Sequence, residues 1–167
     1  MQYAEQKAAI QLPQPHEISE REKEDAMGAY LMMFAAWGAG LPFPLLNLIA
    51  AIIYFFINKK SSKFVAFHSY QSLLTQVPIS LLNAGVIAWV IAIISPCAED
   101  NVYFYTYLVF VVLWNLVYMI FSIIACVKAR KGQYYYFWVF GRMAFARYYS
   151  RDAREESKIH NVPPEGF

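Results

Sequence analysis

The chain has 167 residues, 59% hydrophobic and 18% aromatic, with 14 basic residues, 12 acidic residues and a net charge of +2. Soluble domains are about 45–50% apolar, so this composition excludes an ordinary soluble domain. Residues 27–57, 64–95 and 101–127 are three apolar runs without Asp, Glu, Lys or Arg. Each run exceeds the roughly 20 residues that cross a bilayer. The sequence therefore predicts an integral membrane protein.

The N-terminal segment, residues 1–25, is polar and acidic. It is not a basic stretch followed by an apolar core, so we expect no cleaved signal peptide. Ser19 is followed three residues later by Glu22, the pattern of a capping box. This segment is either a short surface helix that leads into the membrane or a solvated tail.

The first apolar segment, residues 26–57, is long for one membrane span and short for two. Its middle, residues 38–44, contains two glycines and two prolines, which interrupt a helix. We therefore predict two short helices, at about residues 25–37 and 44–58. Either they thin the bilayer locally or they form a re-entrant hairpin that other protein segments shield.

The second apolar run, residues 64–95, carries polar side chains at helical spacing on about half of its circumference. This polar stripe consists of His68, Gln71, Ser72, Thr75, Gln76, Ser80 and Asn83. Unsatisfied polar groups are costly in hydrocarbon, so the polar stripe must face protein or water.

The last span is predicted over residues 102–127, antiparallel to the previous helix, with Asn115 as a partner for the polar stripe. Residues 134–154 then mix aromatic residues with Arg142, Arg147 and Arg151. Aromatic and basic side chains together suit the headgroup layer. We expect an interfacial helix here, on the cytoplasmic side.

The predicted fold is all-α: an integral membrane helical bundle of three to four membrane segments plus the interfacial helix. It comprises an N-terminal tail at residues 1–25, a membrane domain at 26–133 and an aromatic, Arg-rich segment at 134–167. The basic stretches at residues 59–63 and 128–131 mark the cytoplasmic side. We therefore predict a bacterial inner (plasma) membrane protein with both termini in the cytoplasm.

The sequence shows no catalytic, phosphate-binding or dinucleotide-binding motif, so we expect no enzyme activity and no nucleic acid partner. His68 is the only histidine of the apolar runs, which favours a structural hydrogen-bonding role over a cofactor ligand. Cys97 and Cys126 are expected at opposite membrane faces, too far apart to bridge. We expect no metal and no cofactor.

Two short motifs resemble those of a known family. The first comprises Phe64, Phe67, His68, Gln71 and Leu74, and the second Lys128, Lys131, Gly132, Tyr134 and Tyr135. Across residues 27–140 the chain resembles the Tic-twenty-like family, small bacterial membrane proteins similar to the twenty-kilodalton component of the chloroplast inner-envelope translocon. The resemblance implies a four-helix membrane domain and, for the chloroplast relatives, a part in protein translocation.

The function hypothesis is a non-enzymatic accessory or structural subunit of a larger inner-membrane complex, linked to protein translocation. Its expected partners are membrane lipid and other membrane-protein subunits. The candidate interaction and packing residues are His68, Gln71, Thr75, Asn115, Arg142, Arg147 and Arg151. The alternative is a small channel or carrier in which the polar stripe of the helix at residues 64–95 faces water.

Overall fold

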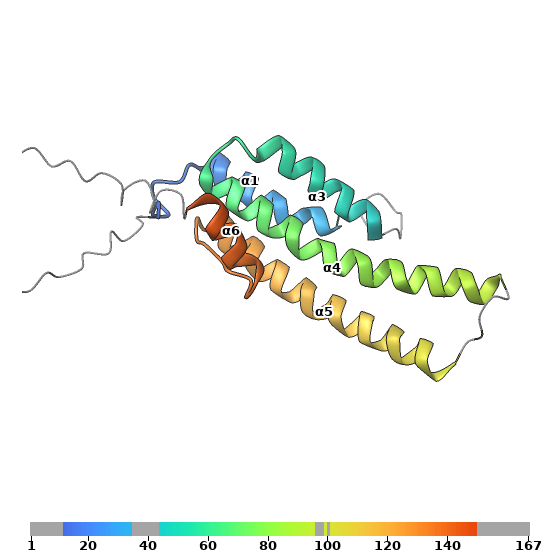
Figure 1. The fold of residues 1–167 in the computed structure, drawn as a ribbon. Helices are drawn as coiled ribbons and strands as arrows, with labels where there is room; N and C mark the ends of the chain where they lie inside the picture. The colour runs from blue at the N-terminus through green and yellow to red at the C-terminus, as the bar shows by residue number, and fades with distance from the viewer. Residues whose placement is uncertain (1–11, 35–43, 96–98, 100, 150–167) are drawn as a thin grey trace, which may run out of the picture.

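The computed structural model describes residues 12–34, 44–95, 99 and 101–149. Within these residues the chain is helical and has no strand, so the all-α prediction is confirmed. Figure 1 shows the elements in chain order. They are α1 (Glu20–Leu31), the 3-10 turn η1 (Met32–Phe34), α3 (Pro44–Asn58), α4 (Lys63–Ile94), α5 (Val102–Arg130) and α6 (Phe140–Tyr148).

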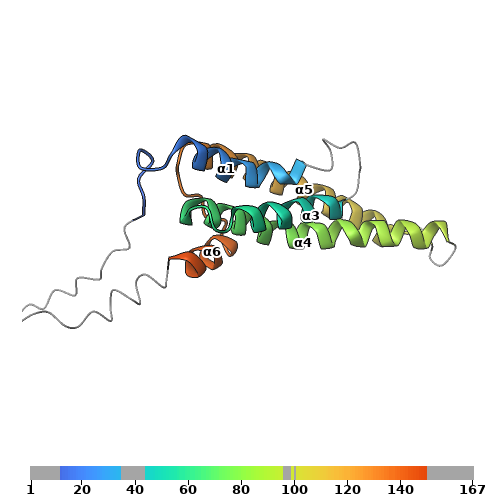
Figure 2. The same cartoon turned by 90° about the horizontal axis from the view of Figure 1, so that it is seen from above.

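Helices α4 and α5 form a long antiparallel pair (Figures 1 and 2). Their 32 and 29 residues correspond to about 48 and 44 Å at about 1.5 Å per residue. Among the described helices, these two are long and apolar enough to cross a membrane. Each begins with a side-chain cap: Ser62 accepts a hydrogen bond from the Val65 amide, and Asn101 accepts from those of Tyr103 and Phe104.

The end of α5 is fixed by Gly132, which has a φ of +69°. The Gly132 amide donates to the Ala129 carbonyl and the Gln133 amide to the Lys128 carbonyl, both at 2.9 Å. These two bonds form a Schellman motif, which glycine favours because it has no Cβ to resist a left-handed backbone. Residues 134–139 then leave the helix direction, so the helix predicted within residues 134–154 begins only at Phe140.

The shorter helices α1, α3 and α6 surround the first half of α4 (Figure 2). The bounds of α3 agree with the predicted helix at residues 44–58. By contrast, α1 begins at Glu20, so the predicted surface helix and the first apolar helix are one element. The domain boundary predicted between residues 25 and 26 lies inside α1. The proline- and glycine-rich break at residues 38–43 lies outside the described residues.

Helix α4 buries most of the polar stripe together with apolar residues of its first turns, and its second half exposes apolar side chains, as expected of a helix in a membrane. Its buried residues all lie between Phe64 and Ser80 and include six of the seven members of the polar stripe. Leu81 and Ile91, by contrast, are exposed on the same helix. The main hydrophobic core lies at the same end, where α1, α4 and α5 meet. It consists of Ile18, Ala26, Tyr30, Phe64, Val65, Ala125 and Ala129.

Candidate functional site

Gln71 uses its whole side-chain amide to join three segments of the chain. Its Nε2 donates to the Tyr30 hydroxyl at 2.9 Å and to the Tyr135 carbonyl at 2.9 Å. Its Oε1 accepts from the Phe137 amide at 3.4 Å. The side chain is fully buried. Gln71 therefore connects α4 to α1 and to residues 134–139 through satisfied polar groups.

The Tyr30 hydroxyl continues this chain of hydrogen bonds to His68, whose Nδ1 lies 2.9 Å away. The tyrosine oxygen already accepts from Gln71. Its own proton is then free to donate to His68 Nδ1, which must be unprotonated to accept it. This assignment pairs all three side chains and places the imidazole proton on Nε2.

Aromatic rings surround the imidazole of His68. The ring centroids of Phe64 and Phe67 lie 4.6 and 5.1 Å from that of His68 in edge-to-face geometry. Tyr134 stacks on the imidazole at 5.8 Å. Among the described residues, His68 Nε2 has no hydrogen-bond partner. The geometry thus holds His68 as a neutral packing residue at the junction of α1, α4 and residues 134–139.

The next turns of the polar stripe also bond to protein. Ser72 donates to the Ala29 carbonyl of α1 at 2.7 Å. Gln76 donates to the Ser72 hydroxyl at 3.4 Å. Thr75 is buried and donates back to the Ser72 carbonyl at 2.8 Å. In this part of α4 the polar stripe faces protein groups.

Farther along α4, Asn83 and Asn115 form a reciprocal amide pair. Asn83 Nδ2 donates to Asn115 Oδ1 at 3.1 Å, and Asn115 Nδ2 donates to Asn83 Oδ1 at 3.2 Å. Each amide also donates at 2.8 Å to a carbonyl one turn earlier in its own helix, that of Ile79 or Val111. Every donor of both side chains is therefore used where α4 meets α5.

Two tyrosines pack in the same way: each side chain lies beside a glycine of a neighbouring helix and donates a hydrogen bond to a backbone carbonyl of that helix. Tyr54 of α3 donates to the Asp25 carbonyl of α1 at 2.7 Å, beside Gly28. Tyr107 of α5 donates to the Leu82 carbonyl of α4 at 2.8 Å, beside Gly85. In both cases the accepting carbonyl lies three residues before the glycine. A Cβ on either glycine would lie 2.3 or 2.5 Å from the tyrosine oxygen. The missing side chain therefore makes room for the phenol.

The charged end of the bundle is cross-linked by exposed ion pairs. Arg130 of α5 lies 2.6 Å from Glu20 and 3.6 Å from Glu24 of α1, and Lys23 lies 2.8 Å from Glu20. Hydrogen bonds, first from Lys23 and then from Arg130, lower the pKa of the Glu20 carboxyl from 4.5 to about 2. The two pairs of Arg130 join α1 to the end of α5, although exposed pairs of this kind stabilise only weakly.

Two of the three predicted arginine sites are on the surface of α6. Arg142 and Arg147 are exposed on α6. The guanidinium of Arg147 lies over the ring of Tyr70, 5.4 Å from its centroid. Lys59 lies over Phe56 in the same way at 4.3 Å. Arg151 lies outside the described residues. This end of the molecule combines cations with aromatic faces.

Tyr30 and Tyr54 are the functional side chains that sequence reasoning missed. A signal was present, because each is a hydroxyl in an otherwise apolar run, and a buried tyrosine usually finds a hydrogen-bond partner. The two tyrosines serve different interfaces: Tyr30 joins α1 to α4, and Tyr54 joins α3 to α1. Neither partner could be named before the helices were placed.

The described residues contain no group of three or more His, Cys, Asp or Glu side chains that could hold a metal ion. Their polar groups are arranged to join helices. The described residues define an all-helical protein with two helices long and apolar enough to cross a membrane and with polar side chains that pack inward at one end.

Comparison with known families gives a specific assignment. Residues 23–144 match the model of the MamF/MmsF family, described as the magnetosome magnetite crystal formation protein family. The matched region begins in α1 and ends in α6, and it makes up most of the chain. The chain belongs to this family. No curated protein and no solved structure matches it.

The resemblance to the Tic-twenty-like family is wrong, because the family model that matches is a different one. The motif residues that suggested it are explained by packing. Phe64, Phe67 and His68 form ring contacts with Tyr134, and Gln71 bonds to the backbone of residues 135 and 137. A short aromatic and polar pattern where two segments pack together does not distinguish one membrane family from another.

The family match also corrects the function expected from the sequence, an accessory subunit linked to protein translocation. The family is described by magnetite crystal formation and not by protein transport. The alternative of a channel or carrier also has no support. Along α4 the polar stripe bonds to Tyr30, Ala29, Tyr135 and Asn115.

Proposed function

We propose that the chain is a magnetosome membrane protein that takes part in magnetite crystal formation. The observation that carries this proposal is the family match over residues 23–144. That region contains both helices able to cross a membrane and the whole polar cluster around Gln71. The proposal therefore concerns the folded bundle as a unit.

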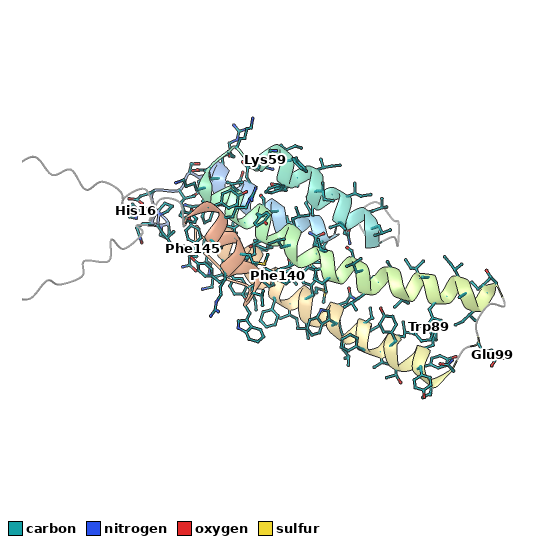
Figure 3. All side chains as sticks on the ribbon, in the orientation of Figure 1. His16, Lys59, Trp89, Glu99, Phe140 and Phe145 are labelled. Carbon is teal, nitrogen blue, oxygen red and sulfur yellow. The ribbon has the colours of Figure 1, made fainter. Side chains whose placement is uncertain are left out.

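The distribution of charge supports an orientation for the bundle. Lys59, Lys60, Lys128 and Lys131 lie at the end that holds the buried cluster, and Glu99 lies near the opposite turn (Figure 3 labels Lys59 and Glu99). Basic residues favour the cytoplasmic side of a membrane. We place the basic end in the cytoplasm and the turn between α4 and α5 inside the vesicle, where a crystal grows.

The bundle acts in this proposal without catalysing a reaction, and membrane lipid is its main partner. Exposed apolar side chains along α5, among them Leu113, Val117 and Ile120, fit lipid contact. The buried polar groups of the polar stripe keep α1 and α4 together within that environment. In this proposal, the protein contributes to crystal formation through the vesicle membrane in which it lies.

Deleting the gene from its host and measuring crystals by electron microscopy tests the proposal. We expect crystals of altered size or number and restoration by the wild-type gene. Restoration should fail with Gln71→Leu combined with Ser72→Leu, which removes the hydrogen bonds from Gln71 to Tyr30 and from Ser72 to Ala29 between α4 and α1. Tyr103→Phe, an exposed substitution, is the matched control and should restore normal crystals.

A second measurement separates function from folding. Immunoblots of purified magnetosome membranes should detect the wild-type protein and the Tyr103→Phe control. Unchanged crystals in the deletion strain, or absence of the protein from magnetosome membranes, would overturn the proposed function.

A further inference from the structure

The helices of this protein are distributed unequally between its two ends. Helices α1, α3 and α6 all lie against the first half of α4, and the far ends of α4 and α5 extend beyond them (Figures 1 and 2). Figure 3 shows Lys59, Phe140 and Phe145 at the crowded end and Trp89 and Glu99 at the other.

Side-chain contacts define where the crowded part stops. Tyr70 of α4 lies against Phe55 of α3 and against Tyr148 and Arg147 of α6. Beyond Ser80, the last buried residue of α4, Asn83, Trp89 and the Leu82 carbonyl contact Asn115, Phe104 and Tyr107 of α5. Within the described residues, α1, α3 and α6 therefore add their volume beside α4 and α5 at one end, and α4 and α5 continue beyond them at the other.

The short helices do not cross a bilayer, so most of their volume lies in the leaflet at the basic end. The 12 residues of α1 and the 15 of α3 span about 18 and 22 Å, short of the ~30 Å hydrocarbon core. In α1, the charged residues Glu20–Asp25 also hold the first turns in the headgroup region. The apolar part of α1 then reaches only into the nearer leaflet.

Helix α6 and the residues before it add to the same leaflet. Gly141 and Ala144 face the bundle and are buried, and Trp138, Val139 and Met143 are exposed apolar side chains on the outside. Exposed Arg142 lies among them in the sequence. An amphipathic segment of this kind inserts at the boundary between headgroups and acyl chains, and its binding depends on curvature.

We propose that the protein is a wedge that prefers and stabilises bilayers curved with the basic end on the convex face. Within the described residues, α1, α3 and α6 enlarge the leaflet at the basic end, and α4 and α5 pass through both leaflets. A membrane relieves this imbalance by curving so that the crowded leaflet lies on the convex face. The partner of this surface is a strongly curved lipid bilayer.

This inference is independent of the proposed function, although the two agree in geometry. If the basic end faces the cytoplasm, it lies on the outer, convex face of an intracellular vesicle. Failure of curvature preference would leave the family assignment and a role in crystal formation untouched. Failure of the crystal experiment would leave the wedge geometry untouched.

The test uses the full chain, fluorescently labelled and reconstituted into vesicles of phosphatidylcholine with phosphatidylglycerol, imaged one vesicle at a time. Protein density per membrane area is compared between vesicles of about 50 nm and about 200 nm, because amphipathic insertion is curvature-sensitive. We expect a several-fold higher density on the smaller vesicles. A density independent of diameter would overturn the proposal.

A matched pair of variants identifies the wedge as the cause. The triple change Trp138→Ser, Val139→Ser and Met143→Ser removes exposed apolar groups at the crowded end and should reduce the preference. The control, Ile94→Ser, Val102→Ser and Tyr103→Ser, changes three other exposed groups, at the narrow end, and should keep the preference. Trp138 is 85% exposed, and Ile94 and Tyr103 are 76% and 74% exposed. Equal preference in both variants would exclude α6 as part of the wedge.

Orientation provides a test that needs no change in the wedge. Lys60→Cys, in a background with Cys97→Ser and Cys126→Ser, reports which molecules have the basic end outside. Labelling by a membrane-impermeant thiol reagent should rise as vesicle diameter falls, because these molecules concentrate on convex surfaces. An accessible fraction that stays constant or falls with decreasing diameter contradicts the wedge.

Discussion

The Tyr30 hydroxyl lies 2.9 Å from His68 Nδ1, although the two residues are 38 positions apart in the sequence. This contact explains how a helix as polar as α1 becomes part of a membrane bundle. The first turns of α1 carry charge, with Glu20, Arg21 and Glu24 exposed. Ala26, Ala29 and Tyr30, in the later turns, are buried. Tyr30 then completes a chain of hydrogen bonds through Gln71 to Tyr135.

Replacing Tyr30 by Phe should destabilise the bundle, because Gln71 loses an acceptor and His68 loses a donor. We expect a loss of about 1 kcal/mol, between the ~0.6 average for intramembrane hydrogen bonds and the roughly 1–3 for leaving a buried group unpaired. Unfolding titrations in mixed detergent measure it. Tyr103→Phe, on an exposed tyrosine, is the control. Equal losses in both variants would mean that packing alone holds this junction.

The Asn83–Asn115 pair should behave as one unit. Asn83→Leu or Asn115→Leu alone leaves an unpaired amide between α4 and α5, whereas the double variant removes both polar groups. The double loss should therefore be smaller than the sum of the single losses, with a coupling of about 0.6 kcal/mol. A double-mutant cycle from the same titrations gives this value. Strict additivity would show that the two amides do not stabilise each other.

Gly28→Ala should weaken the contact between α1 and α3. The added Cβ would lie 2.3 Å from the Tyr54 oxygen, so the phenol must move away from the Asp25 carbonyl. In a Tyr54→Phe background that hydrogen bond is already absent, and the alanine should cost less. Comparing the four proteins by thermal unfolding tests this dependence. The same cost in both backgrounds would show that the glycine serves another purpose. Gly85 and Tyr107 offer an independent repeat.

Acid should weaken the junction between α1 and α5. The folded-state pKa of Glu20 is lowered from 4.5 to about 2. Its stabilising contribution is therefore fully present above pH 4.5 and is lost as the pH falls toward 2. Glu20→Gln should flatten the dependence of stability on pH in this window. The effect is small and should shrink in high salt, because the pair is exposed. An unchanged pH profile in the variant would show that Glu20 does not contribute to the pH dependence of stability.

The parts of the fold that the sequence predicted are those governed by local pattern. Prolines and polar turns bound α3, and the long apolar runs define α4 and α5 to within a few residues. The polar stripe could be read from its helical spacing. Its partners could not, because Tyr30 and Tyr135 come from distant segments whose placement depends on tertiary packing. The packing of the Tyr54 and Tyr107 phenols beside Gly28 and Gly85 could not be predicted for the same reason.

The charge asymmetry gives the final prediction, the orientation of the α4–α5 pair in the membrane. Lys59, Lys60 and Lys131 lie at one end, and Glu99 lies near the other, so the positive-inside rule places Ser61 in the cytoplasm and Glu99 across the membrane. Ser61→Cys and Glu99→Cys, each in a background with Cys97→Ser and Cys126→Ser, test this in isolated, sealed intracellular vesicles. An impermeant thiol reagent should label Ser61→Cys directly and Glu99→Cys only after permeabilisation. Reaction of both positions, or of neither, in sealed vesicles would mean that α4 and α5 do not cross the bilayer as a hairpin.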